Sequence, residues 1–378
     1  MDTTTYQLSD LVTIKYGKNQ KKVADENGNI PIYGTGGLMG FATQALYDKP
    51  SVLIGRKGSI DKVKYVDHPF WTVDTLFYTI VNEDIVIPKY LYYLMSLMDM
   101  KQYNEGTTIP SLRTETLNRI ELEIPPIDDQ KKVLECLNPI DAKITNNEAI
   151  NRNLTEQFRA IVDDFVENLE DYRLMRLDEV AECQNGHAFY KDGYDESGAF
   201  VIDLGNVNTS ANFVYTNADK YISMDRYEQS KLEKYHVFKD DLVMVMTDRK
   251  STMDLLGKTG KVYKDGYYLL NQRMYRIRAK DNINVNYLYA ILNSSKVNNS
   301  LKEKALGSVQ KYVNTKEINE IEIMLPTPDK MEELAQVVNP ISSKMETNIL
   351  ENENLHNLRD ELLPKLMSGE LNVSDLDI

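Results

Sequence analysis

The chain is poor in the residues that build disulfide frameworks, metal centres and membrane spans. Of 378 residues only two are cysteines, Cys136 and Cys183. The four histidines are scattered, and none flanks a cysteine at the spacing of zinc ligands, so no zinc site is expected. No apolar run approaches the roughly 18 residues of a membrane span, and the first five residues lack the features of a signal peptide. These absences predict a soluble protein of the reducing cytoplasm.

Recognisable catalytic motifs are missing as well. No Asn-Pro-Pro-aromatic or Asp-Pro-Pro-aromatic run offers an adenine pocket. Gly257-Lys258-Thr259 resembles the end of a phosphate-binding loop, but Thr252 stands where that loop requires a glycine. Residues 34–40 miss the dinucleotide-binding spacing by one position. We therefore expect no catalytic residue, no metal and no cofactor in this chain.

Basic side chains are outnumbered, and the net charge of −14 at first argues against nucleic acid as a partner. The distribution of this charge changes the interpretation. Residues 1–125 carry a net charge of −2 and residues 171–325 of 0, whereas residues 126–170 carry −5 and residues 326–378 carry −7. The two large blocks can each hold a local basic patch, while the two short acidic segments need another partner.

An internal repeat organises the chain. Residues 112–125 align with residues 313–326 at an offset of 201, and Asn138-Pro139-Ile140 falls on Asn339-Pro340-Ile341 at the same offset. Further upstream the offset drifts, so that Tyr90 matches Tyr287 and Gly17 matches Gly186. The two halves therefore share a frame and differ inside it.

After each repeat junction, apolar residues recur about every 3.5 positions, which is typical of a coiled-coil seam. The predicted helix-pairing positions are Leu137, Ile144, Asn147, Asn151 and Leu154 in the first segment, and Val338, Met345, Asn348, Asn352 and Leu355 in the second. Two asparagines lie at matching positions of each seam, where a buried amide fixes register, although each could instead face solvent. Arg359 interrupts the second seam, and Pro139 and Pro340 are expected to kink or restart their helices.

Short β-rich runs broken by turns fill the two larger blocks, for example residues 51–54, 242–246 and 274–278. In the last of these runs Arg276 and Arg278 share one face of the strand, which either a solvated or a DNA-facing sheet would explain. The expected fold class is α+β, with two mixed α/β domains and two long antiparallel coiled-coil helices in a pseudo-two-fold repeat. The expected segments are residues 1–125, 126–170, 171–325 and 326–378.

The junction that opens the first helix, Ile124-Pro125-Pro126-Ile127-Asp128-Asp129-Gln130, resembles that of the specificity subunits of Type I restriction-modification systems. Further runs stand in the order typical of their recognition domains: Ile30-Pro31-Ile32-Tyr33-Gly34-Thr35-Gly36-Gly37, Leu53-Ile54-Gly55-Arg56-Lys57-Gly58-Ser59-Ile60, Asn185-Gly186-His187-Ala188-Phe189 and Leu270-Asn271-Gln272-Arg273. Asp61 departs from this pattern, because a glycine is usual there. The second junction, residues 328–331, lacks the acidic-Gln signature.

This resemblance implies two target-recognition domains, residues 1–125 and 171–325, that each read one half of a bipartite, asymmetric DNA sequence. The helices of residues 126–170 and 326–378 would form a spacer on which two methyltransferase subunits dock. Those subunits would bind S-adenosylmethionine and methylate adenine N6, and restriction subunits would complete the complex. The chain itself would be a non-catalytic subunit.

Base edges and phosphates are contacted mainly by Arg, Lys, Asn, Gln, Ser and Thr side chains, so loops rich in these residues are the candidates. In the first block the predicted DNA-binding residues are Lys18, Lys21, Lys22, Tyr33, Thr35, Arg56 and Lys57. In the second they are His187, Asn206, Arg249, Lys250, Gln272 and Arg273. For each of them, ordinary surface or structural duty is an alternative.

Two other functions fit the same sequence. A stand-alone DNA-binding protein would use the repeat to grip two half-sites without methyltransferase partners. A coiled-coil scaffold would bind proteins only. The neighbouring genes would distinguish a stand-alone DNA-binding protein from a Type I specificity subunit. A DNA-binding assay with partner subunits present would distinguish both from a scaffold that binds proteins only.

Overall fold

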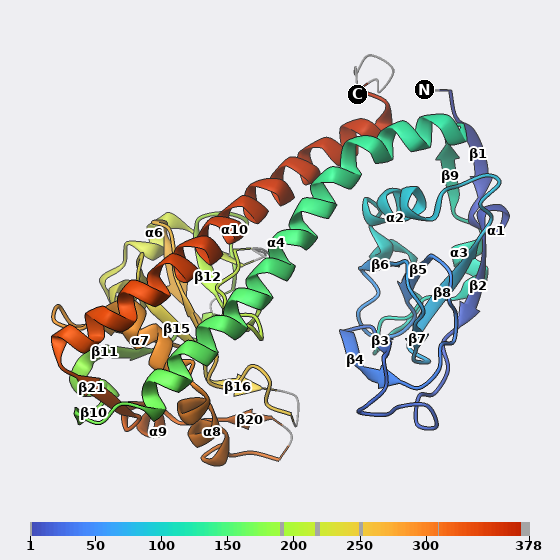
Figure 1. Cartoon of the computed structure of the whole chain (residues 1–378). Coiled ribbons are helices and arrows are strands. Elements are labelled where there is room, and N and C mark those ends of the chain that lie inside the picture. Colours follow the sequence, from blue (N-terminus) through green and yellow to red (C-terminus); the bar gives the residue numbers. More distant parts are fainter. Residues whose placement is uncertain (1, 190–192, 216–219, 249–251, 309, 372–378) are drawn as a thin grey trace. The chain divides into compact units, whose positions relative to one another are not determined.

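The computed structural model describes residues 2–189, 193–215, 220–248, 252–308 and 310–371. The chain forms two compact units (Figure 1). The first unit consists of residues 1–142 and 356–378, and the second of residues 143–355. Each long helix therefore contributes one part to each unit.

The first unit holds three sheets and the short helices between them. Its elements are β1 (Thr4–Gln7), α1 (Leu8–Leu11), β2 (Val12–Tyr16), β3 (Ile30–Gly34), β4 (Gly37–Ala42), β5 (Ser51–Gly55), β6 (Val63–Val66), β7 (Trp71–Thr72), β8 (Leu76–Val81), α2 (Pro88–Ser96), η1 (Met100–Tyr103), α3 (Thr114–Asn118) and β9 (Glu121–Ile124). The strand orders are β2-β8-β5-β6, β4-β3-β7 and β1-β9. All pairs are antiparallel except β3 with β7.

The second unit repeats this topology. Its elements are β10 (Tyr172–Arg176), α5 (Leu177–Val180), β11 (Ala181–Asn185), β12 (Ala199–Ile202), η3 (Leu204–Asn206), β13 (Tyr221–Ile222), α6 (Met224–Tyr227), η4 (Ser230–Tyr235), β14 (His236–Val237), β15 (Leu242–Val245), β16 (Thr247–Asp248), β17 (Thr259–Lys261), β18 (Tyr268–Leu270), β19 (Met274–Ala279), α7 (Val285–Leu292), α8 (Ser295–Glu303), β20 (Lys311–Tyr312), α9 (Thr315–Asn319) and β21 (Glu322–Pro326). The order β11-β19-β15-β17 corresponds to β2-β8-β5-β6, and β10-β21 corresponds to β1-β9. The parallel pair β12 with β18 corresponds to β3 with β7.

The apolar runs of the sequence form the inner strands of these sheets. All residues of β5 and of β15 are buried, because side chains on opposite faces of each strand pack into different core clusters. A strand that is buried on both faces has a continuous apolar sequence and no alternation. The expectation of two mixed domains with two long helices is confirmed.

The two long helices are α4 (Ile127–Glu167) and α10 (Pro328–Ser368). Within each unit their segments run side by side in opposite directions (Figure 1). Neither Pro139 nor Pro340 restarts its helix, because α4 and α10 each continue through the proline. Both prolines are exposed, and so are Glu135 and Gln336, whose carbonyls lose their helical donors. Water can satisfy those carbonyls, and the helices continue.

Four asparagines meet where α4 and α10 pair in the second unit. Asn348 is fully buried and its Nδ2 donates to Asn151 Oδ1 at 2.8 Å, while Asn151 Nδ2 donates to the Met345 carbonyl at 3.2 Å. One turn away, Asn147 Nδ2 donates to Asn352 Oδ1 at 2.9 Å. The Nδ2 group of each asparagine thus donates to an acceptor on the opposite helix, and a shift of the register would break these bonds.

The corresponding helix pairing in the first unit depends on a carboxylate. Asp141 of α4 accepts from Arg359 of α10 at 3.4 Å and from Lys89 of α2 at 3.0 Å, and it also accepts a hydrogen bond from the Tyr93 hydroxyl. Burial alone would raise the pKa of Asp141, but these donors together lower it. Arg359, which interrupts the apolar seam, is therefore held by a partner on the opposite helix.

We predict that Asn348→Ala destabilises the protein, because the buried Asn151 Oδ1 then loses its donor. The expected loss in the free energy of unfolding is about 1–3 kcal/mol. Denaturant-induced unfolding of the full chain measures it. Asn354→Ala, at an exposed position of the same helix, is the matched control and should change stability by less than about 0.5 kcal/mol. Equal stability of the two variants would contradict a structural role for the buried amide pair.

Candidate nucleic-acid interface

Several loops of the first unit are hydrogen-bonded to one turn between two of its strands. This turn, residues 72–75, links β7 to β8 and is called the first central turn below. Main-chain hydrogen bonds join it to three other segments: Lys18 N–H to Thr72 O at 2.8 Å, Arg56 N–H to Thr75 O at 2.8 Å and Val73 N–H to Tyr33 O at 3.0 Å. Segments distant in the sequence are thereby held at one place.

The second unit has the same arrangement around residues 270–273, the second central turn, which leads from β18 into β19. Its main-chain hydrogen bonds are His187 N–H to Leu270 O at 2.9 Å, Met246 N–H to Arg273 O at 3.0 Å and Asn271 N–H to Ile202 O at 2.9 Å. Position by position, Lys18 corresponds to His187, and Arg56 corresponds to Met246. The frame is made by backbone groups, so it is the same in both units although the side chains differ.

A glycine at each unit lets the chain pass close to its central turn. A Cβ atom on Gly17 would lie 2.0 Å from the Val73 carbonyl oxygen, and one on Gly186 would lie 1.9 Å from the Asn271 carbonyl oxygen. Either contact is far too short for any side chain. The close packing of the chain on each central turn therefore requires a glycine at these two positions.

A hollow of about 710 Å³ opens beside the second central turn. It is lined by Tyr194, Asp203, Leu204, Gly205, Lys220, Thr247, Asp248, Leu255, Asn271, Gln272 and Arg273. Lys220 forms an ion pair with Asp203, and Asp203 Oδ1 accepts from the Gly205 N–H at 2.9 Å. The hollow therefore offers donors of several kinds, from a guanidinium, an amide and a hydroxyl, above a fixed backbone.

The predicted residues of the first unit divide into two groups. Lys18, Lys21, Lys22 and Lys57 are exposed, and Thr35 is half-buried at the β3–β4 turn, 3.9 Å from a Cβ built on Gly58. These side chains are available to a ligand. Arg56 is also half-buried and Tyr33 is buried, and both take part in contacts within the unit.

Arg56 and Tyr33 take part in internal contacts. Arg56 Nη1 donates to the Asp74 carbonyl at 2.7 Å, which ties it to the first central turn. The Tyr33 ring is 8% exposed, and its hydroxyl is 3.1 Å from His68 Nε2. Burial, and then the charge of Asp67, raises the pKa of Tyr33.

In the second unit Gln272 and Arg273 are half-buried and line the hollow. His187 lies against Phe189 and Tyr235, with ring centroids at 4.8 and 5.1 Å. The structure places Asn206 inside the unit, because it is 2% exposed and its side chain bonds Asp203 N and the Val214 carbonyl. Arg249 and Lys250 lie outside the described residues.

The two arginines of β19 make contacts inside the unit and are not among the residues that line the hollow. Arg276 is 7% exposed and donates to the carbonyls of Lys234 and His236. Arg278 makes two hydrogen bonds of 2.7 Å to Asp241, which is itself 2% exposed. Their face of the strand is covered by the segment that contains η4 and β14, and the two guanidinium groups hold that segment in place.

Several residues that were not predicted from the sequence lie around the same turns. In the hollow they are Tyr194, Asp203, Lys220 and Thr247. The repeat could have indicated Thr247, because it occupies the position of Lys57: β16 pairs with β20, as Lys57 pairs with Ser111. Tyr194, Asp203 and Lys220 belong to loops in which the repeat offset is lost.

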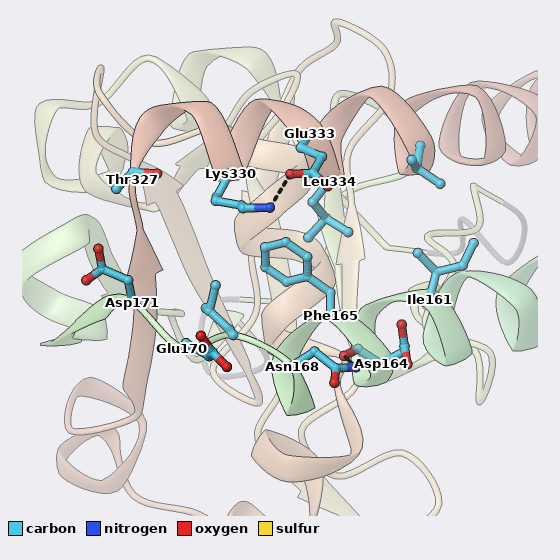
Figure 2. A pocket seen from close by; sticks show the side chains of 12 residues that line it. Ile161, Asp164, Phe165, Asn168, Glu170, Asp171, Thr327, Lys330, Glu333 and Leu334 are labelled. Atoms are coloured by element: carbon cyan, nitrogen blue, oxygen red, sulfur yellow. Dashed lines mark hydrogen bonds and ion pairs between the residues drawn. The ribbon is translucent and has the colours of Figure 1, made fainter.

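A second hollow, of about 600 Å³, lies between the end of α4 and the beginning of α10 (Figure 2). Phe165 of α4 and Leu334 of α10 point toward one another across it. Asp164, Glu170 and Asp171 stand at its rim, and Lys330 is paired with Glu333 at 2.6 Å. Its wall is apolar and its rim is acidic.

Three further observations concern other kinds of site. Among the described residues, no three His, Cys, Asp or Glu side chains gather as metal ligands would. Burial raises the pKa of the Cys183 thiol to about 12. Of the helices that the structure describes, none combines the length and the apolar character needed to cross a bilayer.

Comparisons with known proteins agree with this geometry. The family described as the Type I restriction modification DNA specificity domain matches residues 1–156 and 169–355. The chain is 25% identical over 355 residues to the Type I restriction enzyme MjaIX specificity subunit of Methanocaldococcus jannaschii, covering 88% of this chain and 80% of that protein. The MjaVIII specificity subunit of the same organism is 23% identical over 314 residues, covering 76% and 71%.

A solved structure shares the fold. The S subunit of a Type I restriction-modification system from M. genitalium superposes with a TM-score of 0.53 at 16% identity. The match covers 97% of this chain and 96% of that one. At this identity the likeness concerns the fold alone.

We predict that Gly17→Ala destabilises the first unit, since its Cβ would meet a backbone carbonyl that cannot move without breaking the frame. The free energy of unfolding should fall by about 1–3 kcal/mol. Gly36→Ala is the matched control, because no atom lies within 4 Å of a Cβ built there, and it should cost less than about 0.5 kcal/mol. Thermal unfolding of both variants decides the matter; a Gly17→Ala protein as stable as the control would show that the first central turn is not held as described.

Proposed function

Because the chain belongs to the family of Type I restriction modification DNA specificity domains, we propose that it reads a bipartite, asymmetric sequence of double-stranded DNA. Each unit would read one half. The chain would place the two adenine-N6 methyltransferase subunits and the restriction subunits of its complex on that sequence, without catalysing either reaction itself.

The observation that carries this proposal is the repeated frame with different side chains. Lys18 and His187 occupy equivalent positions, as do Lys57 and Thr247. A basic side chain in one unit is thus replaced by an imidazole or a hydroxyl at the equivalent position of the other unit. Two readers with the same backbone and different donors would recognise two different half-sequences, and the whole sequence would be asymmetric.

The second central turn supports direct contact with bases. Gln272 and Arg273 project from it beside the hollow, and their amide and guanidinium groups are the donors that pair with adenine and guanine edges in the major groove. Exposed lysines such as Lys21 and Lys22 suit backbone phosphates in the first unit. Affinity and sequence readout would thus come from different residues.

The acidic helices support the docking of protein subunits. Residues 126–170 and 326–378 together carry most of the net charge of −14, which DNA would repel. The second hollow, with its apolar wall and acidic rim, would suit an apolar protein segment that carries basic residues. We infer that methyltransferase subunits bind along these helices and bring S-adenosylmethionine with them, so that this chain needs no cofactor. Such a complex would work in the cytoplasm.

We predict that exchanging residues 171–325 for the equivalent domain of a relative changes one half of the methylated sequence and leaves the other intact. The chain and its variant are each co-expressed with the methyltransferase subunit encoded beside it, and methylated adenines are mapped. The unexchanged chain is the control. A change in both halves, or in neither, would show that the two units do not divide the reading between them.

The purified chain should methylate no DNA when S-adenosylmethionine and magnesium are supplied, because the methyl transfer is assigned to another subunit. Adding the methyltransferase subunit should restore methylation at the mapped sequence. Incorporation of labelled methyl groups measures both states. Methylation by the chain alone, in a preparation free of the partner, would overturn the non-catalytic assignment.

A further inference from the structure

Three basic side chains of the second unit lie near one another. They are Arg159 on α4, Lys258 just before β17 and Lys302 on α8, and each is half-buried. Within the described part of the chain, none of the three side chains has a hydrogen bond or an ion pair. This group is called the cation cluster below. Half-buried cations without partners are costly to a fold and call for an explanation.

The elements that carry the cation cluster are fastened to one another. Ser295, at the start of α8, donates to Asp163 of α4 from its backbone N–H at 2.9 Å and from its hydroxyl at 2.6 Å. Gly257 packs on α8 so closely that a Cβ atom there would lie 2.8 Å from Leu301 Cδ1. Lys258 follows Gly257, and Lys302 follows Leu301. The three cations are therefore held together by the fold.

The electrostatics agree with this geometry. Burial, and then the charges of Arg159 and Lys302, lowers the pKa of Lys258 to about 8, while the nearby Asp254 opposes that shift. Asp254 has an interaction of its own. Three cations thus outnumber the one carboxylate that acts on Lys258, and an anion bound among them would be stabilised.

The first unit offers an internal comparison. Ile54 pairs with Val63 as Met244 pairs with Thr259, so Asp61 occupies the position of Gly257. At the offset of 201, Lys101 corresponds to Lys302, and Lys101 forms an ion pair with Asp61 at 3.8 Å.

Asp360 corresponds to Arg159 at the same offset. The charge of Asp360 raises the pKa of Tyr92, and the charge of Arg159 lowers the pKa of Tyr289, so each charge lies near an equivalent tyrosine of its own unit. The first unit thus supplies carboxylates at two positions where the second has Gly257 and Arg159. The positive charge is left unbalanced in the second unit.

We propose that the cation cluster binds a phosphate group of the DNA backbone, so that α4 itself holds DNA beside the second unit. This inference rests on the proposed DNA-reading function and extends it to a helix otherwise assigned to spacing and subunit docking. The contact is with a phosphodiester, so it adds affinity and no sequence information. DNA would then bind more tightly at the cation cluster of the second unit than at the equivalent positions of the first unit.

The test uses the full chain in complex with its methyltransferase subunits and a labelled duplex that contains the mapped target sequence. Dissociation constants are measured over a range of salt concentrations for the unchanged chain and for Arg159→Gln, Lys258→Met and Lys302→Gln. Each substitution should weaken binding and reduce the slope of log affinity against log salt by up to about 0.9, the value for one phosphate. Because the three cations hold one phosphate, the triple variant should lose about 0.9 in total.

Two controls remove charge without touching the cation cluster. Lys304→Gln lies on the exposed surface just after α8, and Lys101→Gln removes the paired lysine at the equivalent position of the first unit. Both should leave the salt slope unchanged, and the methylated sequence should stay the same in every variant. Salt slopes of the cluster variants equal to that of the unchanged chain would overturn the inference.

Two other outcomes are distinct from that one. If the unchanged complex neither binds the duplex specifically nor methylates it, the proposed function fails. If the cluster variants lose methyltransferase subunits during gel filtration while the controls keep them, the cations belong to a protein interface and the phosphate assignment is wrong.

Stability gives an independent measurement. Lys258→Met removes a desolvated cation, so the DNA-free protein should unfold at a higher temperature than the unchanged chain, although it binds DNA more weakly. Folding lowers the pKa of Lys258 from 10.5 to about 8, so the penalty is present at neutral pH and declines as the pH rises through that window. The difference in unfolding temperature between the two proteins should shrink accordingly. A lower unfolding temperature for Lys258→Met at neutral pH would show that Lys258 stabilises the fold.

Discussion

The antiparallel register of the two long helices depends on a pair of buried amides. Asn151 and Asn348 bond each other only when α4 and α10 are aligned as they are, because a shift by one turn would break this buried hydrogen bond and the bond between Asn147 and Asn352. Apolar contacts along the seam would tolerate several registers. The amides therefore contribute specificity, and the packing of Phe158 and Leu334 into the core of the second unit then follows from the same alignment.

Two different principles govern the frame and the surface of each unit. The central turns are held by main-chain hydrogen bonds and by close approaches at Gly17 and Gly186. The surface around them is built from loops whose sequences differ between the units. In the second unit those loops enclose a hollow with Arg273 on its wall. The two units therefore share one backbone frame and differ in the surface that is built on it.

The sequence predicted the architecture well because the relevant signals are regular. A repeat at an offset of 201 and a period near 3.5 indicated two domains and two helices, and the strands at residues 51–54, 242–246 and 274–278 are present. Individual side chains were harder to predict. Arg276 and Arg278 share a face that looked open, because a strand pattern cannot reveal that another segment covers it.

Candidate ligand contacts were predictable only by residue type. Asn206 has the right chemistry for a base contact, yet its amide is consumed by its own loop. Pro139 shows the same limit for local rules, since its position on the exposed side of α4 decides whether a helix continues. Composition indicates which groups are present, whereas tertiary contacts decide which of them are free.

The frame around each central turn joins N–H to C=O groups and so is indifferent to the identity of most side chains attached to it. Substitutions at Gln272 or Arg273 would leave Met246 N–H bonded to the carbonyl of residue 273 and Asn271 N–H bonded to Ile202 O. Such positions can drift or be replaced in blocks at little cost to folding. A lineage could therefore acquire a new recognition surface through changes in a few loops, while the backbone frame that holds those loops stays unaltered.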